Sequence, residues 1–166
     1  MISDETRYQE AGHALGAVKF DIGLADRGIE INSDEDAYTY IRLPDPKSLT
    51  DEDYCIRRAA TKLAGPAAQL RFEKRPFTEQ ELESDHRTIG DLNEARRILQ
   101  QYWSERGERN DYEIQRQLDD AGIMAHNAVQ THWSAVEAVV AASRATSHIS
   151  AETIRSIVGP AGSGSE

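Results

Sequence analysis

Apolar residues recur at intervals of three and four along most of this 166-residue chain. That spacing places them on one face of a helix, so it predicts a largely helical protein. In the first helix the apolar stripe runs from Tyr8 to Val18. Three longer helical segments follow, and their stripes begin at Ile56, Ile89 and Ile114. We expect the second of them to open at Ser84-Asp85 and the third to follow Asn110 as one long segment through Val140.

Residues 20–45 depart from this helical pattern. The runs 28–31 and 37–41 alternate with a period of two between Gly, Asn and Asp residues, which is typical of a β-hairpin. Pro44 and Pro46 should end the second run. We therefore predict a mainly α fold of the α+β class, with one small antiparallel β-ribbon after the first helix.

Two helical segments contain residues that are unfavourable in a helix. Gly12 and Gly16 each cost about 1 kcal/mol relative to Ala. They lie four positions apart on one face, so we expect another backbone to approach them closely. In the second segment, Gly65-Pro66 predicts a kink or a break.

The length fits one domain. We assign it to residues 3–158, including a short last helix from Ser150 to Ile157. Residues 159–166 are mostly Gly, Ser, Pro and Ala, and they predict a flexible tail.

Charge and hydropathy exclude several classes of protein. The chain has 29 acidic and 19 basic residues, a net charge of −10, which disfavours binding to nucleic acid or to an anionic membrane. No stretch approaches the roughly 18 apolar residues that a membrane span needs, and the acidic N-terminus does not resemble a signal peptide. Cys55 is the only cysteine, so a reducing, cytoplasmic location is expected.

The most informative motif combines Gln9, Glu10 and His13. Zinc peptidases carry H-E-x-x-H on a helix, where two His side chains face one metal ion and the Glu serves as general base. Here Glu10 and His13 keep that spacing, and Gln9 stands where the first His would be. Spacing alone favours an ordinary surface pair of Glu10 and His13, three residues apart, over a metal site.

Residues 8–15, Y-Q-E-A-G-H-A-L, resemble the Y-H-E-A-G-H-A-L string of FtsH-type zinc metallopeptidases, the protease domain of AAA proteases. Residues 63–69 (L-A-G-P-A-A-Q), 84–92, 125–138 and 150–154 resemble further segments of that family in the same order. The resemblance implies a helical peptidase domain that hydrolyses peptide bonds with zinc.

The resemblance also implies the roles of individual residues. Zinc ligands would be Gln9, His13 and Asp85, and Glu10 would be the general base. Three protein ligands leave one zinc position open for the attacking water.

Asp85 has a simpler interpretation as the cap of a helix. Asp91 is an alternative third ligand, or else an exposed helix acid. His86 could replace the missing imidazole, or else be an ordinary surface residue.

Two residues depart from the family pattern. Gln9 offers a neutral carboxamide oxygen, a weaker zinc ligand than an imidazole, so zinc affinity and hydrolysis should be weak or absent. Gln69 replaces the family's Glu and removes a charge.

The chain has no phosphate-binding loop, so it would act on polypeptides alone, as a homo-oligomer, or with a separate ATPase. The alternative functions are a pseudo-peptidase that binds polypeptides as an adaptor, and a helical interaction domain unrelated to peptidases.

Overall fold

The computed structural model describes residues 1–161, which form seven α-helices, one 3₁₀ turn and three strands. The predicted class, mainly α with a small β part, is confirmed. In chain order the elements are α1 (Asp4–Lys19), β1 (Leu24–Ile31), β2 (Ala37–Ile41), η1 (Ser48–Thr50), α2 (Glu52–Phe72), α3 (Glu79–Ser84), α4 (Thr88–Glu105), α5 (Asp111–Thr131), α6 (Trp133–Ala145), β3 (His148–Ile149) and α7 (Ala151–Val158).

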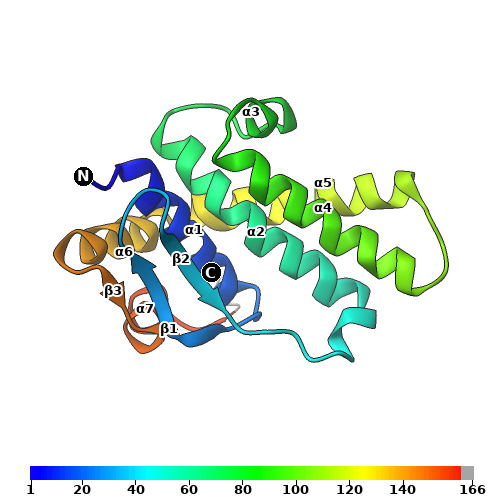
Figure 1. The fold of residues 1–166 in the computed structure, drawn as a ribbon, viewed down its shortest axis with the longest axis horizontal. Coiled ribbons are helices and arrows are strands. Elements are labelled where there is room, and N and C mark those ends of the chain that lie inside the picture. Colours follow the sequence, from blue (N-terminus) through cyan, green and yellow to red (C-terminus); the bar gives the residue numbers. More distant parts are fainter. Residues whose placement is uncertain (162–166) are drawn as a thin grey trace.

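Helix α1 lies between two groups of elements (Figure 1). On one side α2, α4 and α5 pack together around a core that includes Leu63, Leu99 and Leu118. On the other side the sheet, α6 and α7 enclose a second core with Leu15 and Ile154. Side chains on α1 are therefore held from both sides.

The sheet has the order β2-β1-β3, and both pairings are antiparallel. The predicted ribbon of residues 28–31 and 37–41 is confirmed, although β1 begins earlier, at Leu24. Strand β3 was not predicted because two residues cannot show a period of two.

The backbone hydrogen bonds fix which edge of β2 faces away from β1. The Arg42 amide donates to the Gly23 carbonyl, and the Asp36 carbonyl accepts from the Asn32 amide. Because these groups alternate along a strand, the even-numbered residues bond to β1. The N–H and C=O groups of the odd-numbered residues Ala37, Thr39 and Ile41 face outward, and no strand among the described residues pairs with that edge.

Helices α1 and α2 approach each other closely at the two predicted glycines. A Cβ atom at Gly12 would lie 2.2 Å from the carbonyl oxygen of Ala64, and one at Gly16 would lie 3.0 Å from the Cα of Thr61. The expectation of a close backbone approach is therefore confirmed.

Two predicted helix ends were wrong, and one predicted break is absent. The break that was one alternative at Gly65-Pro66 does not occur: α2 continues through Pro66, although proline removes one intrahelical hydrogen bond, and both residues are buried in the helix packing. Residues 110–140 form two helices that meet at His132 rather than one segment. Ser84 ends α3 rather than opening a helix, and α4 begins only at Thr88.

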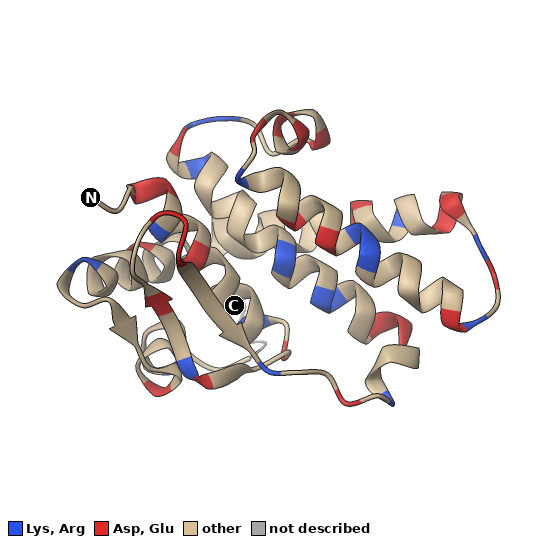
Figure 2. Ribbon diagram, viewed as in Figure 1, with Lys and Arg blue, Asp and Glu red and all other residues tan. Residues whose placement is uncertain are grey.

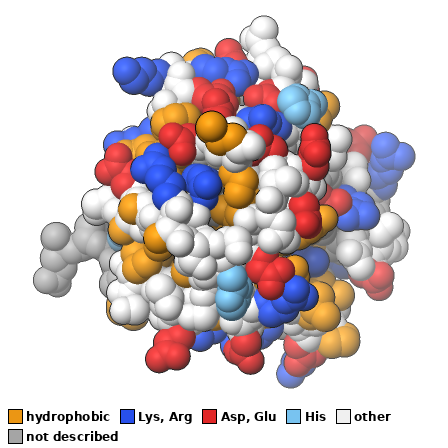
Figure 3. Space-filling view, turned by 60° about the vertical axis from the view of Figure 1, so that its left-hand side comes forward, with side chains coloured by type: hydrophobic (Ala, Val, Ile, Leu, Met, Phe, Trp, Pro, Cys, Tyr) orange, Lys and Arg blue, Asp and Glu red, His pale blue; other side chains and the backbone are white. Residues whose placement is uncertain are grey.

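The short helix predicted from Ser150 is confirmed as α7, with the Ser150 side chain accepting a hydrogen bond from the Thr153 amide. The predicted tail, 159–166, lies largely outside the described residues. Within residues 1–161 no helix is both long and apolar enough to span a bilayer. On the face seen in Figure 3, hydrophobic side chains form small separate areas between charged ones.

Candidate metal centre

Helix α1 presents Gln9, Glu10 and His13 to a surface hollow of about 230 Å³. Gln9 and His13 are four positions apart, so the helical repeat places them one turn apart on the same face. Asp91 from α4 and Thr39 from β2 line the same hollow. The hollow therefore lies where α1, α4 and the edge strand of the sheet meet.

Asp91 is the carboxylate that joins Gln9 and His13. Its Oδ2 atom lies 3.1 Å from Nε2 of His13 and accepts a 2.7 Å hydrogen bond from Nε2 of Gln9. Burial raises the pKa of Asp91, but the His13 imidazolium and the hydrogen bonds from His13 and Gln9 outweigh burial and lower it. Asp91 is therefore an ionised carboxylate fixed between two side chains of α1.

His13 is buried, and both of its ring nitrogens have partners. Nδ1 lies 3.1 Å from the carbonyl oxygen of Thr61, an acceptor, so this nitrogen carries a proton and the other nitrogen faces Asp91. Burial lowers the pKa of His13, but the Asp91 carboxylate outweighs burial and raises it to about 9. The α2 backbone thus orients the ring so that Nε2 faces the hollow.

Gly65 leaves the space that this imidazole needs. A Cβ atom at position 65 would lie 2.4 Å from both Cε1 and Nε2 of His13. Any larger residue would therefore collide with the ring, which gives Gly65 a role that the sequence-based expectation of a kink did not include.

Glu10 is almost fully buried beside the same hollow. The Thr39 hydroxyl donates a 2.6 Å hydrogen bond to its Oε2 atom. Burial raises the pKa of Glu10, although the neighbouring His13 and the hydrogen bond from Thr39 oppose that rise. A buried carboxyl with a raised pKa and a fixed orientation is suited to proton transfer.

Gln9 is held by two acceptors. Its amide nitrogen donates to Asp91 and also to the backbone carbonyl oxygen of Arg87, 3.1 Å away. Since neither partner can donate, the NH₂ group and not the carbonyl oxygen must face them. In this arrangement Gln9 presents hydrogen-bond donors to the position where the resemblance implies a metal ligand.

Asp85 lies in a different cluster. Its Oδ2 atom accepts hydrogen bonds from Arg75 and from Gln69, both at 3.2 Å, and its Oδ1 atom accepts from the Arg87 amide. Asp85 does not line the hollow that contains His13. The structure therefore brings Gln9, Glu10 and His13 together with Asp91, the alternative ligand, and gives Asp85 a structural ion pair.

His86, the possible replacement for the missing imidazole, and Gln69, the second departure from the family pattern, both lie near Asp85. His86 is almost fully exposed, and its Nδ1 atom lies 3.7 Å from Asp85. Gln69 is fully buried, and its amide nitrogen bonds Glu73 and Asp85, while its oxygen has no partner among the described residues.

The separation of the side chains suits a zinc ion, but their donor atoms suit it less well. Neighbouring ligands of a tetrahedral zinc are roughly 3.3 Å apart, close to the His13–Asp91 separation of 3.1 Å. However, the set contains one imidazole, one carboxylate and one carboxamide, and the carboxamide presents its nitrogen. Among residues 1–161 no group of three or more His, Cys, Asp or Glu side chains could hold a metal ion. Among the described residues at this hollow, His13 and Asp91 are therefore the strong zinc ligands, and Gln9 is a weak third one.

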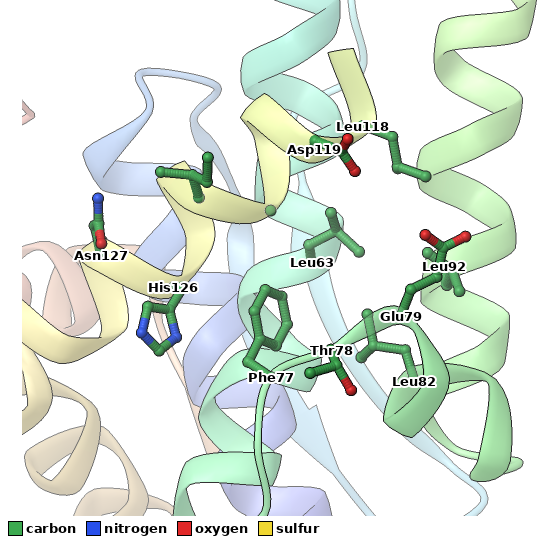
Figure 4. Close-up of a pocket in the computed structure, with 12 residues that line it drawn as sticks. Leu63, Phe77, Thr78, Glu79, Leu82, Leu92, Leu118, Asp119, His126 and Asn127 are labelled. Atoms are coloured by element: carbon green, nitrogen blue, oxygen red, sulfur yellow. The ribbon is translucent and has the colours of Figure 1, made fainter. Parts of the chain in front are cut away.

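A second, mainly apolar hollow of about 350 Å³ lies between α2, α3, α4 and α5 (Figure 4). Leu63 and Phe77 point into it, and Phe77 stacks on His126 with 5.8 Å between ring centroids. Leu63 and Gly65 are two positions apart, so they lie on opposite sides of α2. Asp91, His13 and the other residues that line the hollow at Glu10 do not line this second one, so it does not belong to the candidate metal centre.

Sequence reasoning missed the role of Thr39 and ranked Asp91 below Asp85. Thr39 lies in a strand of ordinary β composition, and nothing in its sequence neighbourhood marks it. For Asp91 a usable signal existed: it lies in the first turn of α4, at the start of the apolar stripe that packs on α2. In the structure this position lies beside the middle of α2, where Thr61 and Gly65 contact His13.

Comparison of the sequence with models of known protein families found no match, and comparison with curated protein sequences found no relative. The resemblance to FtsH-type metallopeptidases therefore stays a prediction from the residues.

Proposed function

We propose that this chain is a metallopeptidase-like domain of the FtsH type, in which Gln9 leaves weak metal binding and little or no peptide-bond hydrolysis. The observation that supports it is the convergence of Gln9, His13 and Asp91 beside Glu10. Two elements 78 positions apart provide the imidazole and the carboxylate. Glu10 and His13 are both buried, whereas an ordinary surface pair would be exposed.

In the zinc peptidases that the motif resembles, the ion activates water for attack on a peptide carbonyl. Within this chain the role proposed for Glu10 is that of general base. Its carboxylate borders the hollow beside His13, and Thr39 holds it in one orientation. Among the residues of the edge strand that line the hollow, Thr39 is the one that donates a hydrogen bond to the Glu10 side chain.

The proposed substrate or partner is a polypeptide in an extended conformation. The outward N–H and C=O groups of Ala37, Thr39 and Ile41 form a strand edge that no described strand covers, and a further strand can add to it by main-chain hydrogen bonds. Because the Thr39 side chain contacts Glu10, a strand added at this edge would pass alongside the candidate centre.

The second candidate function is a pseudo-peptidase that binds polypeptides without cutting them. The observation that favours it is that the polar side chains of the site already bond to one another: Gln9 donates a hydrogen bond to Asp91, and Asp91 pairs with His13. A site whose polar groups already satisfy one another needs no metal ion for stability. The hydrolytic and non-hydrolytic functions share the same strand edge and differ only in turnover.

Energy for unfolding folded substrates would have to come from a separate ATPase, or the chain would act alone or as a homo-oligomer on unfolded segments.

The lone Cys55 is buried and forms no disulfide, in keeping with the reducing cytoplasm, where we propose that the protein acts.

The test is hydrolysis of a fluorescently labelled unfolded protein by three zinc-loaded proteins: the unmodified chain, Gln9→His, and Gln9→His with Glu10→Gln. We expect little or no cleavage by the first, clear cleavage by the second and none by the third. Cleavage by the unmodified chain at the rate of Gln9→His would remove the pseudo-peptidase alternative. Absence of cleavage by Gln9→His, with zinc bound, would contradict the metallopeptidase proposal.

A further inference from the structure

We propose that the groove beside β2 binds extended polypeptide segments with acidic side chains at alternate positions. This inference rests on the proposed function, because it specifies which polypeptides the strand edge would accept. It concerns recognition alone and requires no metal ion.

The first observation is the sign of the charge along the groove. A hollow of about 250 Å³ runs beside β2, and it is lined by Arg42, Arg58 and Lys62 and by no acidic residue among those described. Lys62 also borders the adjoining hollow at Glu10, together with Arg87. The whole chain carries a net charge of −10, so this basic groove is opposite in sign to the protein as a whole. Figure 2 shows several basic bands along the ribbon of α2.

The second observation is that two of these cations, Arg58 and Lys62, have side chains without partners within the described residues, whereas Arg87 contacts Glu5 and Ser3. Arg58 and Lys62 take part in no ion pair or hydrogen bond in residues 1–161. Arg57, the neighbour of Arg58, bonds instead to Asp53 and to the Phe20 carbonyl oxygen. The carboxylates nearest to Lys62 are already engaged, since Asp91 pairs with His13 and Glu10 accepts from Thr39. Arg58 and Lys62 can therefore pair with carboxylates from a bound chain.

The spacing of the cations matches that of a strand. Arg58 and Lys62 are four positions apart on α2, so their Cβ atoms lie about 6 Å apart. Alternate residues of an extended chain are about 6.6 Å apart and point to the same side. A peptide paired with β2 could thus direct two alternate carboxylates toward Arg58 and Lys62, while its backbone bonds to the outward groups of Thr39 and Ile41.

Apolar side chains at the groove define the rest of the recognition surface. Tyr38 is 53% exposed and Leu43 is 87% exposed, which is unusual for side chains of this size in this protein. Both line the same hollow as the cations. We therefore expect apolar residues to be accepted between the acidic ones.

The experiment measures binding of fluorescent peptides of about eight residues by polarisation, in the presence of EDTA. One peptide alternates Glu with Val and Thr, a second has Gln at each Glu position, and a third has Lys there. We expect the Glu peptide to bind about tenfold more tightly than the Gln peptide, the Lys peptide to bind least, and binding to weaken in about 1 M salt.

Two variants test the residues. Arg58→Gln with Lys62→Gln should reduce affinity for the Glu peptide about tenfold and leave that for the Gln peptide unchanged. Lys74→Gln with Arg109→Gln removes the same charge from exposed positions outside the groove, and it should change neither. A Glu peptide with N-methyl groups on alternate residues should bind more weakly, because the added strand loses its backbone donors.

Equal affinity for the Glu and Gln peptides, or an equal loss in the two double variants, would overturn this inference. Its failure is distinguishable from that of the proposed function. Hydrolysis by Gln9→His would still support a peptidase domain, whereas charge-dependent binding in EDTA would stand without any hydrolysis.

Discussion

Nε2 of His13 lies 3.1 Å from Oδ2 of Asp91, although 78 positions separate the two residues. The contact depends on the packing of α1 against α2, where Gly12, Gly16 and Gly65 remove the side chains that would keep the helices apart. Helix α4 packs on α2 in turn and brings Asp91 to the same place. The candidate centre is thus a consequence of close helix packing.

Asp91→Asn should lower the pKa of His13, because the Asp91 carboxylate is what opposes the effect of burial. Asp85→Asn should leave that pKa near its original value of about 9, since Asp85 pairs with Arg75 instead. Titration of the imidazole protons by NMR measures both. If the pKa of His13 fell equally in the two variants, Asp91 would not be the partner of His13 that the structure indicates.

The stability of the fold should fall as the pH rises from about 6.5 to about 9. The pKa of His13 is raised in the folded protein, to about 9, so its protonated form stabilises the fold below the unfolded value and loses that effect as the pH passes the folded value. The loss should be up to about 3 kcal/mol. Urea unfolding at a series of pH values measures it. The decrease should be much smaller in Asp91→Asn, and an unchanged slope there would assign the effect to other groups.

Gly65→Ala should destabilise the protein by about 1 to 3 kcal/mol, because its Cβ atom would lie 2.4 Å from the His13 ring. Gly90→Ala is the matched control. Gly90 lies inside α4, and no described atom lies within 4 Å of the position that an added Cβ would take, so this change should raise stability by about 0.5 to 1 kcal/mol. Thermal or urea unfolding of the two variants gives the comparison. A stable Gly65→Ala protein with an intact His13–Asp91 contact would refute the proposed role of Gly65.

Cys55 should be unreactive in the folded protein. Burial raises the pKa of its thiol to about 11, so little thiolate exists near pH 8. Alkylation by iodoacetamide should be more than about a hundredfold slower than in the urea-unfolded chain. Mass spectrometry of timed samples measures the rate, and rapid labelling without denaturant would mean that the α2 region opens readily.

The parts of the fold that are encoded within short segments of the sequence could be predicted. The helix with Gln9, Glu10 and His13, the β-ribbon and the close approach at Gly12 all follow from residue spacing or from the conformational cost of glycine. These signals lie within short segments, so the rest of the fold does not alter them.

The partners across the site could not be predicted in the same way. The choice between Asp85 and Asp91 depends on where α4 begins, and the Ser84-Asp85 capping signal led to a start three residues too early. The hydrogen bond from Thr39 to Glu10 depends on how the edge strand lies against α1, which no local pattern contains. Residue spacing therefore placed Gln9, Glu10 and His13 on one helix and offered Asp91 only as the alternative to Asp85, whereas nothing in the sequence indicated Thr39.

The most direct test of the central claim is the zinc content of purified Gln9→His after metal removal and reloading, measured by atomic emission. We expect about one zinc ion per chain in Gln9→His and in Gln9→His with Asp85→Asn, and much less in Gln9→His with Asp91→Asn. A zinc content that does not rise in Gln9→His, or that depends on Asp85 and not on Asp91, would contradict the account of the centre.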